Sequence, residues 1–288
     1  MILITGARGV VGAPLRQALN KSQRGFVAVT RQADQSADEF LSWDLQSALT
    51  AEQIQALAGC RALIHCAPIW LLPDHVDDLL RAGIRRMAVF SSTSVISKSG
   101  SQDPADQILV ESLRDAETAL QDYAQEGKID LTILRPSMIY GYGRDENISH
   151  IARRLRRLRF MPLAGAGRGL RQPVHADDLV AAALNALESD VSVNQVYTLA
   201  GGEQISYRVM VERVFVALGM KPRILQLPVW VVRTLLKLAS IGRGFAYTGS
   251  MADRMNQDLI YDCSDAVNDL EFSPQAFLQH PERDLPNA

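Results

Sequence analysis

Met1-Ile2-Leu3-Ile4-Thr5-Gly6-Ala7-Arg8-Gly9-Val10-Val11-Gly12 is the stretch that decides the fold. A short apolar run leads into three glycines, and an apolar helical pattern then begins at Val11 and continues through Leu15 and Leu19. This order predicts a strand, a tight turn and a helix N-terminus, whose N–H groups and partial positive charge favour a pyrophosphate. We therefore expect Gly6, Ala7, Arg8, Gly9, Val10, Val11 and Gly12 to bind a dinucleotide. The alternative is a strand–helix turn of the same shape without a ligand.

Further apolar runs follow at intervals that leave room for helices. They lie at 26–30, 62–66, 86–91 and 131–135. Continuous apolar strands separated by helical stretches are typical of a parallel sheet buried on both faces. The sequence therefore predicts an α/β fold of the Rossmann type, with a doubly wound parallel sheet.

Composition limits the class of protein. The 288 residues are 47% hydrophobic and 22% charged, with a formal net charge of −2 and a pI near 6.2. This balance argues against a general nucleic-acid binder, and three cysteines without paired or ligand spacing predict a reducing compartment and no metal site. The chain starts on a strand rather than a secretory signal, and no apolar run reaches the ~20 residues of a membrane span. We expect a soluble cytoplasmic protein that acts on a small molecule.

The end of the second predicted strand bears on the kind of dinucleotide. A site for NAD usually places Asp or Glu there, to accept a hydrogen bond from the ribose 2′-hydroxyl. This chain has Thr30-Arg31 instead, and arginine pairs well with a 2′-phosphate. Arg8 in the glycine loop would add a second cation. We therefore predict NADP in preference to NAD, the alternative being that Asp34 serves an NAD ribose.

Several motifs together resemble one family. The Gly-x-x-Gly-x-x-Gly spacing after Thr5 is joined by Leu134-Arg135-Pro136-Ser137-Met138-Ile139-Tyr140-Gly141 and by Val174-His175-Ala176-Asp177-Asp178. The set is similar to the extended branch of the short-chain dehydrogenase/reductase superfamily, the NAD-dependent epimerases and dehydratases, from Met1 to about Gly219. The resemblance implies hydride transfer on a nucleotide sugar or a related carbonyl or alcohol. It also implies a smaller C-terminal lobe that binds the substrate.

The resemblance carries roles over to further cofactor residues. Asp44 and Leu45 match the pair that contacts adenine, although Asp44 is also suited to cap a helix beginning near Ala48. His65, Cys66 and Ala67 match the family's His-x-Ala segment beside the cofactor, with a structural role for His65 as the alternative. Pro136 is expected near the nicotinamide amide.

Other positions are implied for the substrate. Ser91-Ser92-Thr93-Ser94-Val95 resembles the family's catalytic-serine segment, so Thr93 is expected to hold the reacting carbonyl or hydroxyl, with Ser92 beside it. The alternative is a strand end capped by hydroxyls. Tyr140 and two arginines after a glycine-rich loop, Arg168 and Arg171, are further candidates, because the arginine fork suits phosphate. The arginines at 153–159 are expected to face mainly solvent.

The family's catalytic Tyr-x-x-x-Lys is missing. Anchoring the expected helix on Ala116-Glu117 puts Leu109 at the tyrosine position and Leu113 at the lysine position, and no tyrosine occurs between Phe90 and Tyr123. The chain thus resembles atypical members of the superfamily. Either another group moves the proton, with Glu111, Tyr140, Tyr142 and His65 as candidates, or the reaction needs little such help. The third reading is a catalytically silent NAD(P)-binding sensor or accessory subunit.

The expected domains follow from these motifs. Residues 1–143 and 171–200 are predicted to form the dinucleotide-binding domain, and 144–170 and 201–288 the smaller substrate lobe. Asp177 or Asp178 is expected to cap a helix over 179–187. The apolar, basic segment 228–239 predicts a core or lid helix, or else one that rests on a membrane surface or a partner. The sequence leaves a homodimer open.

Overall fold

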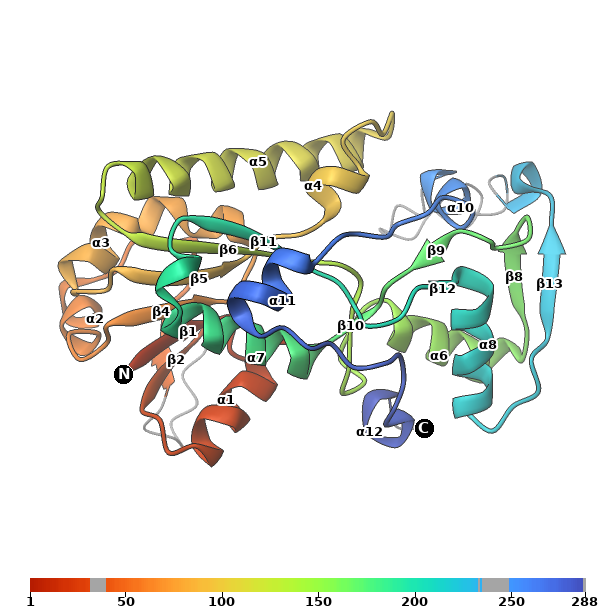
Figure 1. The fold of residues 1–288 in the computed structure, drawn as a ribbon, viewed down its shortest axis with the longest axis horizontal. Coiled ribbons are helices and arrows are strands. Elements are labelled where there is room, and N and C mark those ends of the chain that lie inside the picture. The colour runs from red at the N-terminus through yellow and green to blue at the C-terminus, as the bar shows by residue number, and fades with distance from the viewer. Residues whose placement is uncertain (32–39, 233, 235–248, 287–288) are drawn as a thin grey trace.

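The computed structural model describes residues 1–31, 40–232, 234 and 249–286, and its centre is one seven-stranded sheet (Figure 1). All neighbouring strands are parallel, in the order β11-β6-β5-β4-β1-β2-β3. The predicted doubly wound sheet is therefore confirmed. Its strands are β1 (Ile2–Thr5), β2 (Phe26–Thr30), β3 (Phe40–Ser42), β4 (Ala62–His65), β5 (Arg86–Phe90), β6 (Asp130–Pro136) and β11 (Gln195–Leu199).

Helices cover both faces of the sheet because its strands are apolar on both sides. One face carries α2 (Ala51–Ala56), α3 (Val76–Arg81) and the long α5 (Pro104–Gln125), and the other carries α1 (Gly12–Lys21), α7 (Ala176–Glu188) and α11 (Ser264–Leu270). Short turns of helix complete this part: η1 (Ile69–Leu71), η2 (Pro73–His75), α4 (Ser94–Ser97) and η3 (Asp190–Ser192).

A smaller lobe lies beyond the carboxyl ends of the sheet strands (Figure 1, right). Its own core joins α6, α8 and β8 to the C-terminal residues Phe277 and Leu285. The helices of this lobe are α6 (Ile148–Leu158), α8 (Tyr207–Ala217), α10 (Gly249–Arg254) and α12 (Pro281–Asp284). Its strands pair as β7 (Ile139–Tyr140) with β10 (Val174–His175), β8 (Met161–Ala164) with β13 (Ile224–Leu227), and β9 (Leu170–Arg171) with β12 (Ile205–Ser206).

Some local expectations differ from the structure. Helix α11, placed by prediction in the small lobe, packs Ala266 and Leu270 into the core beneath the sheet. The N-cap of α7 is His175, whose ring accepts from the N–H of Asp177, so neither Asp177 nor Asp178 is the cap. Of the predicted helix 228–239, residues 233 and 235–239 lie outside the described residues, while Val229 and Val232 pack beside Ala164.

The strand ends explain where a site can form. In a parallel sheet all carboxyl ends meet at one edge, and ligands bind in the crevice outside that edge. The loops after β1, β4, β5 and β6 therefore gather there, facing the small lobe. No helix among the described residues is long and apolar enough to cross a bilayer.

Candidate active site

The turn after β1 is closed so tightly that only glycine fits. Gly6 has φ +64°, and a Cβ on it would lie 2.6 Å from the backbone nitrogen of Ala67. A Cβ on Gly12 would lie 2.3 Å from the carbonyl oxygen of Gly6. Helix α1 begins at this point with no side-chain cap and no acidic residue in its first turn. Its N-terminus is thus built to accept an anion rather than a protein side chain.

A cleft of about 870 Å³ opens from this turn. Nine of the residues predicted to bind cofactor line it, whereas Val10, Val11, Gly12, His65 and Pro136 do not. The sequence analysis did not predict six of the lining residues. Most of these six are neighbours in the chain of a predicted residue, so their position at the end of a strand could have identified them. The full lining is Gly6, Ala7, Arg8, Gly9, Val29, Thr30, Arg31, Trp43, Asp44, Leu45, Gln46, Cys66, Ala67, Pro68 and Leu71.

The far wall of the cleft is a turn that starts at Asp44. Its carboxylate accepts from the N–H of Gln46 at 3.1 Å, and Ser47 N–H donates to its carbonyl at 2.8 Å. Helix α2 has a different cap, Thr50, in a capping box with Gln53. His75 lies behind this wall, where its Nε2 donates to the Leu45 carbonyl at 2.8 Å. Asp44 is therefore exposed on the cleft and does not cap α2.

His65 supports the opposite wall. It is fully buried, with Nδ1 2.7 Å from the hydroxyl of Thr5 and Nε2 3.2 Å from the carbonyl of Pro68. Because that carbonyl can only accept, Nε2 carries the proton and Nδ1 accepts from Thr5. Burial lowers the pKa of His65 to about 4, so the ring is neutral at pH 7. These contacts give His65 a structural role behind the cleft wall formed by Cys66, Ala67 and Pro68, and not a place in the cleft itself.

Thr93 lies where β5 ends. Both its N–H and its hydroxyl donate to the carbonyl of Pro136 at 3.1 Å, and its side chain is buried. The half-buried Ser92 hydroxyl donates to that of Ser94 at 3.0 Å. This strand end therefore stands beside Pro136, and the Thr93 hydroxyl points at the carbonyl of Pro136.

Helix α5 presents leucines where acid–base groups are expected. Leu113 is buried in the core between α5 and the sheet, and Leu109 packs against the same cluster. Glu117 holds the helix in place, since its carboxylate accepts from Arg135 at the end of β6 and from Ser91. Neither leucine can move a proton.

The surroundings of Glu111 and Tyr140 do not suit either residue as the replacement acid, which corrects that prediction. Glu111 is exposed, and it lies two residues from both Leu109 and Leu113, on the opposite side of α5. Tyr140 is fully buried in the small-lobe core, where its hydroxyl accepts from the N–H of Leu278, and burial raises its pKa. Tyr142 donates to Asp177 at 2.6 Å, and burial raises its pKa to about 12.

The two arginines predicted to bind substrate differ in exposure. Arg168 is exposed on the turn between β8 and β9. Arg171 is buried, and its guanidinium donates hydrogen bonds to the backbone carbonyls of Leu170, Gln257 and Arg254. Arg171 therefore fastens β9 to the segment after α10, which corrects its expected place as a free phosphate ligand.

An ion network at the start of α5 was missed. The buried carboxylate of Asp106 accepts from Lys98 at 2.8 Å, from Ser101 at 2.8 Å and from Arg254 at 2.6 Å. These hydrogen bonds hold the pKa of Asp106 down to about 2 in spite of burial. Asp106 lies one helical turn before Leu109 on the same face. The spacing of Asp106 and Leu109 could have drawn attention to Asp106. Its partner Arg254 could not be predicted, because it lies 148 residues further along the chain.

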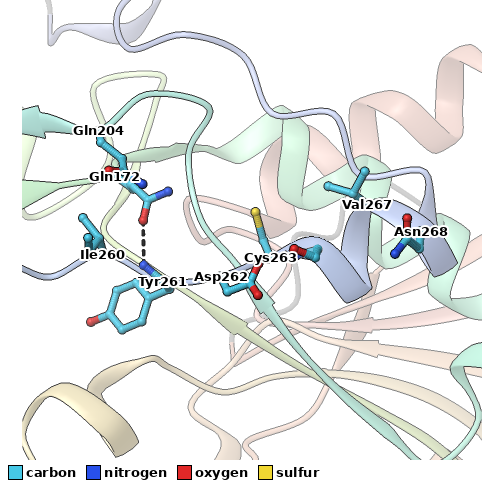
Figure 2. Close-up of a pocket in the computed structure, with 9 residues that line it drawn as sticks. Gln172, Gln204, Ile260, Tyr261, Asp262, Cys263, Val267 and Asn268 are labelled. Atoms are coloured by element: carbon cyan, nitrogen blue, oxygen red, sulfur yellow. Dashed lines mark hydrogen bonds between the residues drawn. The ribbon is translucent and has the colours of Figure 1, made fainter.

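A second hollow, of about 720 Å³, lies along the segment between α10 and α11 (Figure 2). Gln172 joins it to the small lobe by accepting from Tyr261 N–H at 2.7 Å. Its thiol, Cys263, has its pKa raised by burial and is no ready nucleophile. Among the described residues no cluster has the composition of a metal site.

Comparisons with known proteins agree with this architecture. The model of the NAD dependent epimerase/dehydratase family matches residues 76–200. A UDP-glucose 4-epimerase of Vibrio cholerae is 22% identical over 96% of this chain and 92% of its own length.

Solved structures give the same picture. MoeE5 in complex with UDP-glucuronic acid and NAD has a TM-score of 0.74 at 22% identity, covering 98% of this chain and 96% of its own. A UDP-glucuronic acid 4-epimerase from Bacillus cereus in complex with NAD has a TM-score of 0.74 at 18% identity, covering 98% and 94%. The chain thus shares the fold of these two proteins. Both complexes hold NAD, so they give the predicted preference for NADP no support.

Proposed function

We propose that this chain, which matches the NAD dependent epimerase/dehydratase family over residues 76–200, is an NAD-dependent enzyme that acts on a nucleotide sugar as the epimerases do. The observation that carries the proposal is the cleft at the glycine turn, where the open N-terminus of α1 meets the ends of β1, β2 and β4. MoeE5 bound to UDP-glucuronic acid and NAD, and the UDP-glucuronic acid 4-epimerase bound to NAD, support the choice of cofactor and substrate class.

The residues of the cleft fit a dinucleotide. The backbone of Gly6 to Gly9 and the start of α1 would hold the diphosphate, because among the described residues no side chain caps this helix end. Asp44 and Leu45 would contact the adenine, and Arg31, which also lines the cleft, would lie beside the adenosine ribose. When bound, NAD supplies a reversible acceptor of hydride.

Proton transfer needs a group other than the missing tyrosine. We assign this role to Lys98, which forms an ion pair with Asp106, and Asp106 lies one helical turn before Leu109 on α5. The side chain of Lys98 is held by this ion pair and is still 22% exposed. The Thr93 hydroxyl, on turning from Pro136, would orient the substrate oxygen.

A second function is favoured by Leu109 and Leu113. Two apolar side chains at the acid–base positions are what a silent dinucleotide sensor or accessory subunit would carry. Such a protein would bind NAD with no turnover, and the small lobe would serve a partner rather than a substrate.

Titration calorimetry and product analysis separate the two. We expect saturable NAD binding and slow conversion of UDP-glucose or UDP-glucuronic acid, followed by NMR of the sugar. Lys98→Met should lower the rate by about 10²–10⁴ while NAD binding stays unchanged, since loss of a general acid has that effect. Lys128→Met, at an exposed lysine, is the matched control.

The outcomes are distinct. Binding without conversion across a panel of UDP-sugars would favour the silent sensor. An active Lys98→Met enzyme would remove Lys98 from the mechanism but leave the enzyme assignment standing. No heat with either NAD or NADP would overturn the proposal as a whole.

A further inference from the structure

Charge is divided very unevenly along this chain. Residues 147–176 and 213–252 carry thirteen of its 30 Lys and Arg residues and none of its 32 Asp and Glu residues. A net charge of −2 therefore hides a strongly basic part within an acidic remainder. Several of these cations serve the fold, for example Arg171 on backbone carbonyls and Arg213 with Glu203. The others that the structure describes add positive charge to the small lobe, on α6, before β9 and before β13.

The excess is concentrated at the outer end of that lobe. Helix α6 ends with Arg157 and Leu158, Arg159 is its C-cap, and Phe160 then leads into β8. Lys221 and Arg223 precede the neighbouring β13, and the N–H of Met161 donates to the carbonyl of Arg223 at 2.9 Å. All four cations are exposed. Figure 1 shows β8 and β13 at the end of the molecule away from the seven-stranded sheet.

Large apolar side chains stand among these cations. Leu158 and Phe160 are each 40% exposed, and Leu225 is 50% exposed. Leu225 pairs with Pro162, so it shares the outer face of β8 and β13, whereas Met161 and Leu163 face the core. The inner part of that outer face is covered, since Leu227 and Ala164 pack with Val232. We call the exposed set, Arg157, Leu158, Arg159, Phe160, Lys221, Arg223 and Leu225, the basic tip.

We propose that the basic tip docks on an anionic lipid bilayer. Interfaces of this kind combine Lys and Arg, which attract acidic head groups, with aromatic and aliphatic side chains that enter the head-group boundary. A free anion would not need the exposed Phe160 and Leu225. A second copy meeting the same surface would oppose cation to cation, which disfavours self-association through the tip. The bilayer satisfies both the charge and the apolar area.

The consequence is a protein held at a surface with its cleft free. The glycine turn lies near the ends of β1 and β4, far along the molecule from β13 (Figure 1). Docking through the tip would thus leave cofactor exchange unhindered. The binding is reversible and salt-dependent, because exposed charges are screened within about 8 Å at 0.15 M salt.

Vesicle co-sedimentation of the full chain tests the proposal. Vesicles of phosphatidylcholine alone are compared with vesicles holding about one third phosphatidylglycerol at about 0.1 M salt. We expect binding to the acidic vesicles only, with most of it lost at about 0.5 M salt. Each basic residue at an anionic surface changes partitioning by about fivefold, so Arg157→Glu with Arg223→Glu should weaken binding by at least about tenfold.

Apolar variants and a matched control complete the design. Phe160→Ser with Leu225→Ser should also weaken binding, since both side chains would enter the boundary. The control pair, Ile108→Ser with Arg114→Glu, makes one apolar and one charge-reversing change at exposed positions of α5 and should bind as the wild type does. Circular dichroism of every variant checks the fold.

Several results would overturn the proposal. Equal affinity for neutral and acidic vesicles would remove the role of charge. Tip variants that bind as the wild type does would place the contact elsewhere. Binding to RNA but not to vesicles, or a tip-dependent dimer in sedimentation, would assign the surface to another partner.

Discussion

At the scale of single residues, the cation at the end of β2 bears on cofactor choice. Arg31 lines the cleft and is exposed there. A charge-assisted bond from arginine to a 2′-phosphate contributes about 1.5–3 kcal/mol, whereas NAD has only a neutral 2′-hydroxyl at that point. Arg31→Ala should therefore weaken NADP binding by about tenfold or more, with NAD affinity changed less than about twofold. Calorimetry with both dinucleotides measures this, with Arg24→Ala as control. Parallel losses for both would remove Arg31 from cofactor discrimination.

His65 makes stability depend on pH. Its pKa is about 4 in the folded protein, compared with an ordinary value of 6.5, because burial disfavours the charged ring. Between these values the unfolded chain takes up a proton that the folded one does not. Stability should thus fall by about 3 kcal/mol as pH drops from 6.5 to 4.

Urea unfolding at several pH values isolates this effect. His65→Gln should be less stable than the wild type at pH 7, yet its stability should fall by about 3 kcal/mol less on acidification to pH 4. Other titrating groups are common to both proteins and cancel in the difference. Identical pH profiles would mean that the ring titrates normally in the folded state.

At the scale of elements, the start of α5 is fastened to the rest by one carboxylate. Asp106 ties the loop after α4, through Lys98 and Ser101, and α10, through Arg254, to this helix. Asp106→Asn would leave two partly buried cations without their counter-charge, which costs about 3 kcal/mol.

The matched control for Asp106 is Asp115→Asn, an exposed aspartate on the same helix that should change stability by less than about 0.5 kcal/mol. Urea unfolding compares the two, and hydrogen exchange should show faster opening of residues 98–101 and 252–254 in Asp106→Asn alone. Equal exchange in both variants would show that the network does not hold α10. The pKa of about 2 predicts that this contribution persists down to about pH 4 and is lost as pH falls toward 2.

At the scale of the whole molecule, the C-terminal segment closes the structure by returning to β10 and α7. Asp284 is fully buried, and its carboxylate accepts from His175 Nε2 at 2.9 Å and from Arg283 at 3.0 Å. The carbonyl of Asp284 accepts from Gly143 N–H at 2.9 Å. The C-terminal segment thus forms hydrogen bonds with Gly143 and His175, which precede it by more than 100 residues.

Asp284→Ala should lower the free energy of unfolding by about 3–5 kcal/mol, because it removes the hydrogen-bond acceptor of the buried His175 and of Arg283. Glu282→Ala, two residues away and exposed, is the control and should be near neutral. Thermal unfolding measures both. Similar melting temperatures for the two variants would contradict the assigned role of the C-terminal segment.

The sequence by itself determined the sheet and its glycine turn, because both rest on local signals. Apolar runs of strand length and a glycine that must accept φ +64° identify β1, β4, β5 and β6 without any knowledge of neighbours. The strand ends also placed most of the cleft, because in a parallel sheet they meet at one edge. The prediction that Leu109 and Leu113 occupy the tyrosine and lysine positions also rests on a local signal, the spacing of residues along a helix.

Only the tertiary structure decided which polar groups are available. Tyr140 and Arg171 look available for chemistry in the sequence. In the structure the phenol of Tyr140 is buried in the small-lobe core, and the guanidinium of Arg171 donates to backbone carbonyls. Asp106 looks ordinary until Arg254, far along the chain, pairs with it. Burial and long-range pairing set the charge state and reach of a side chain, and both depend on contacts between distant segments that no local pattern encodes.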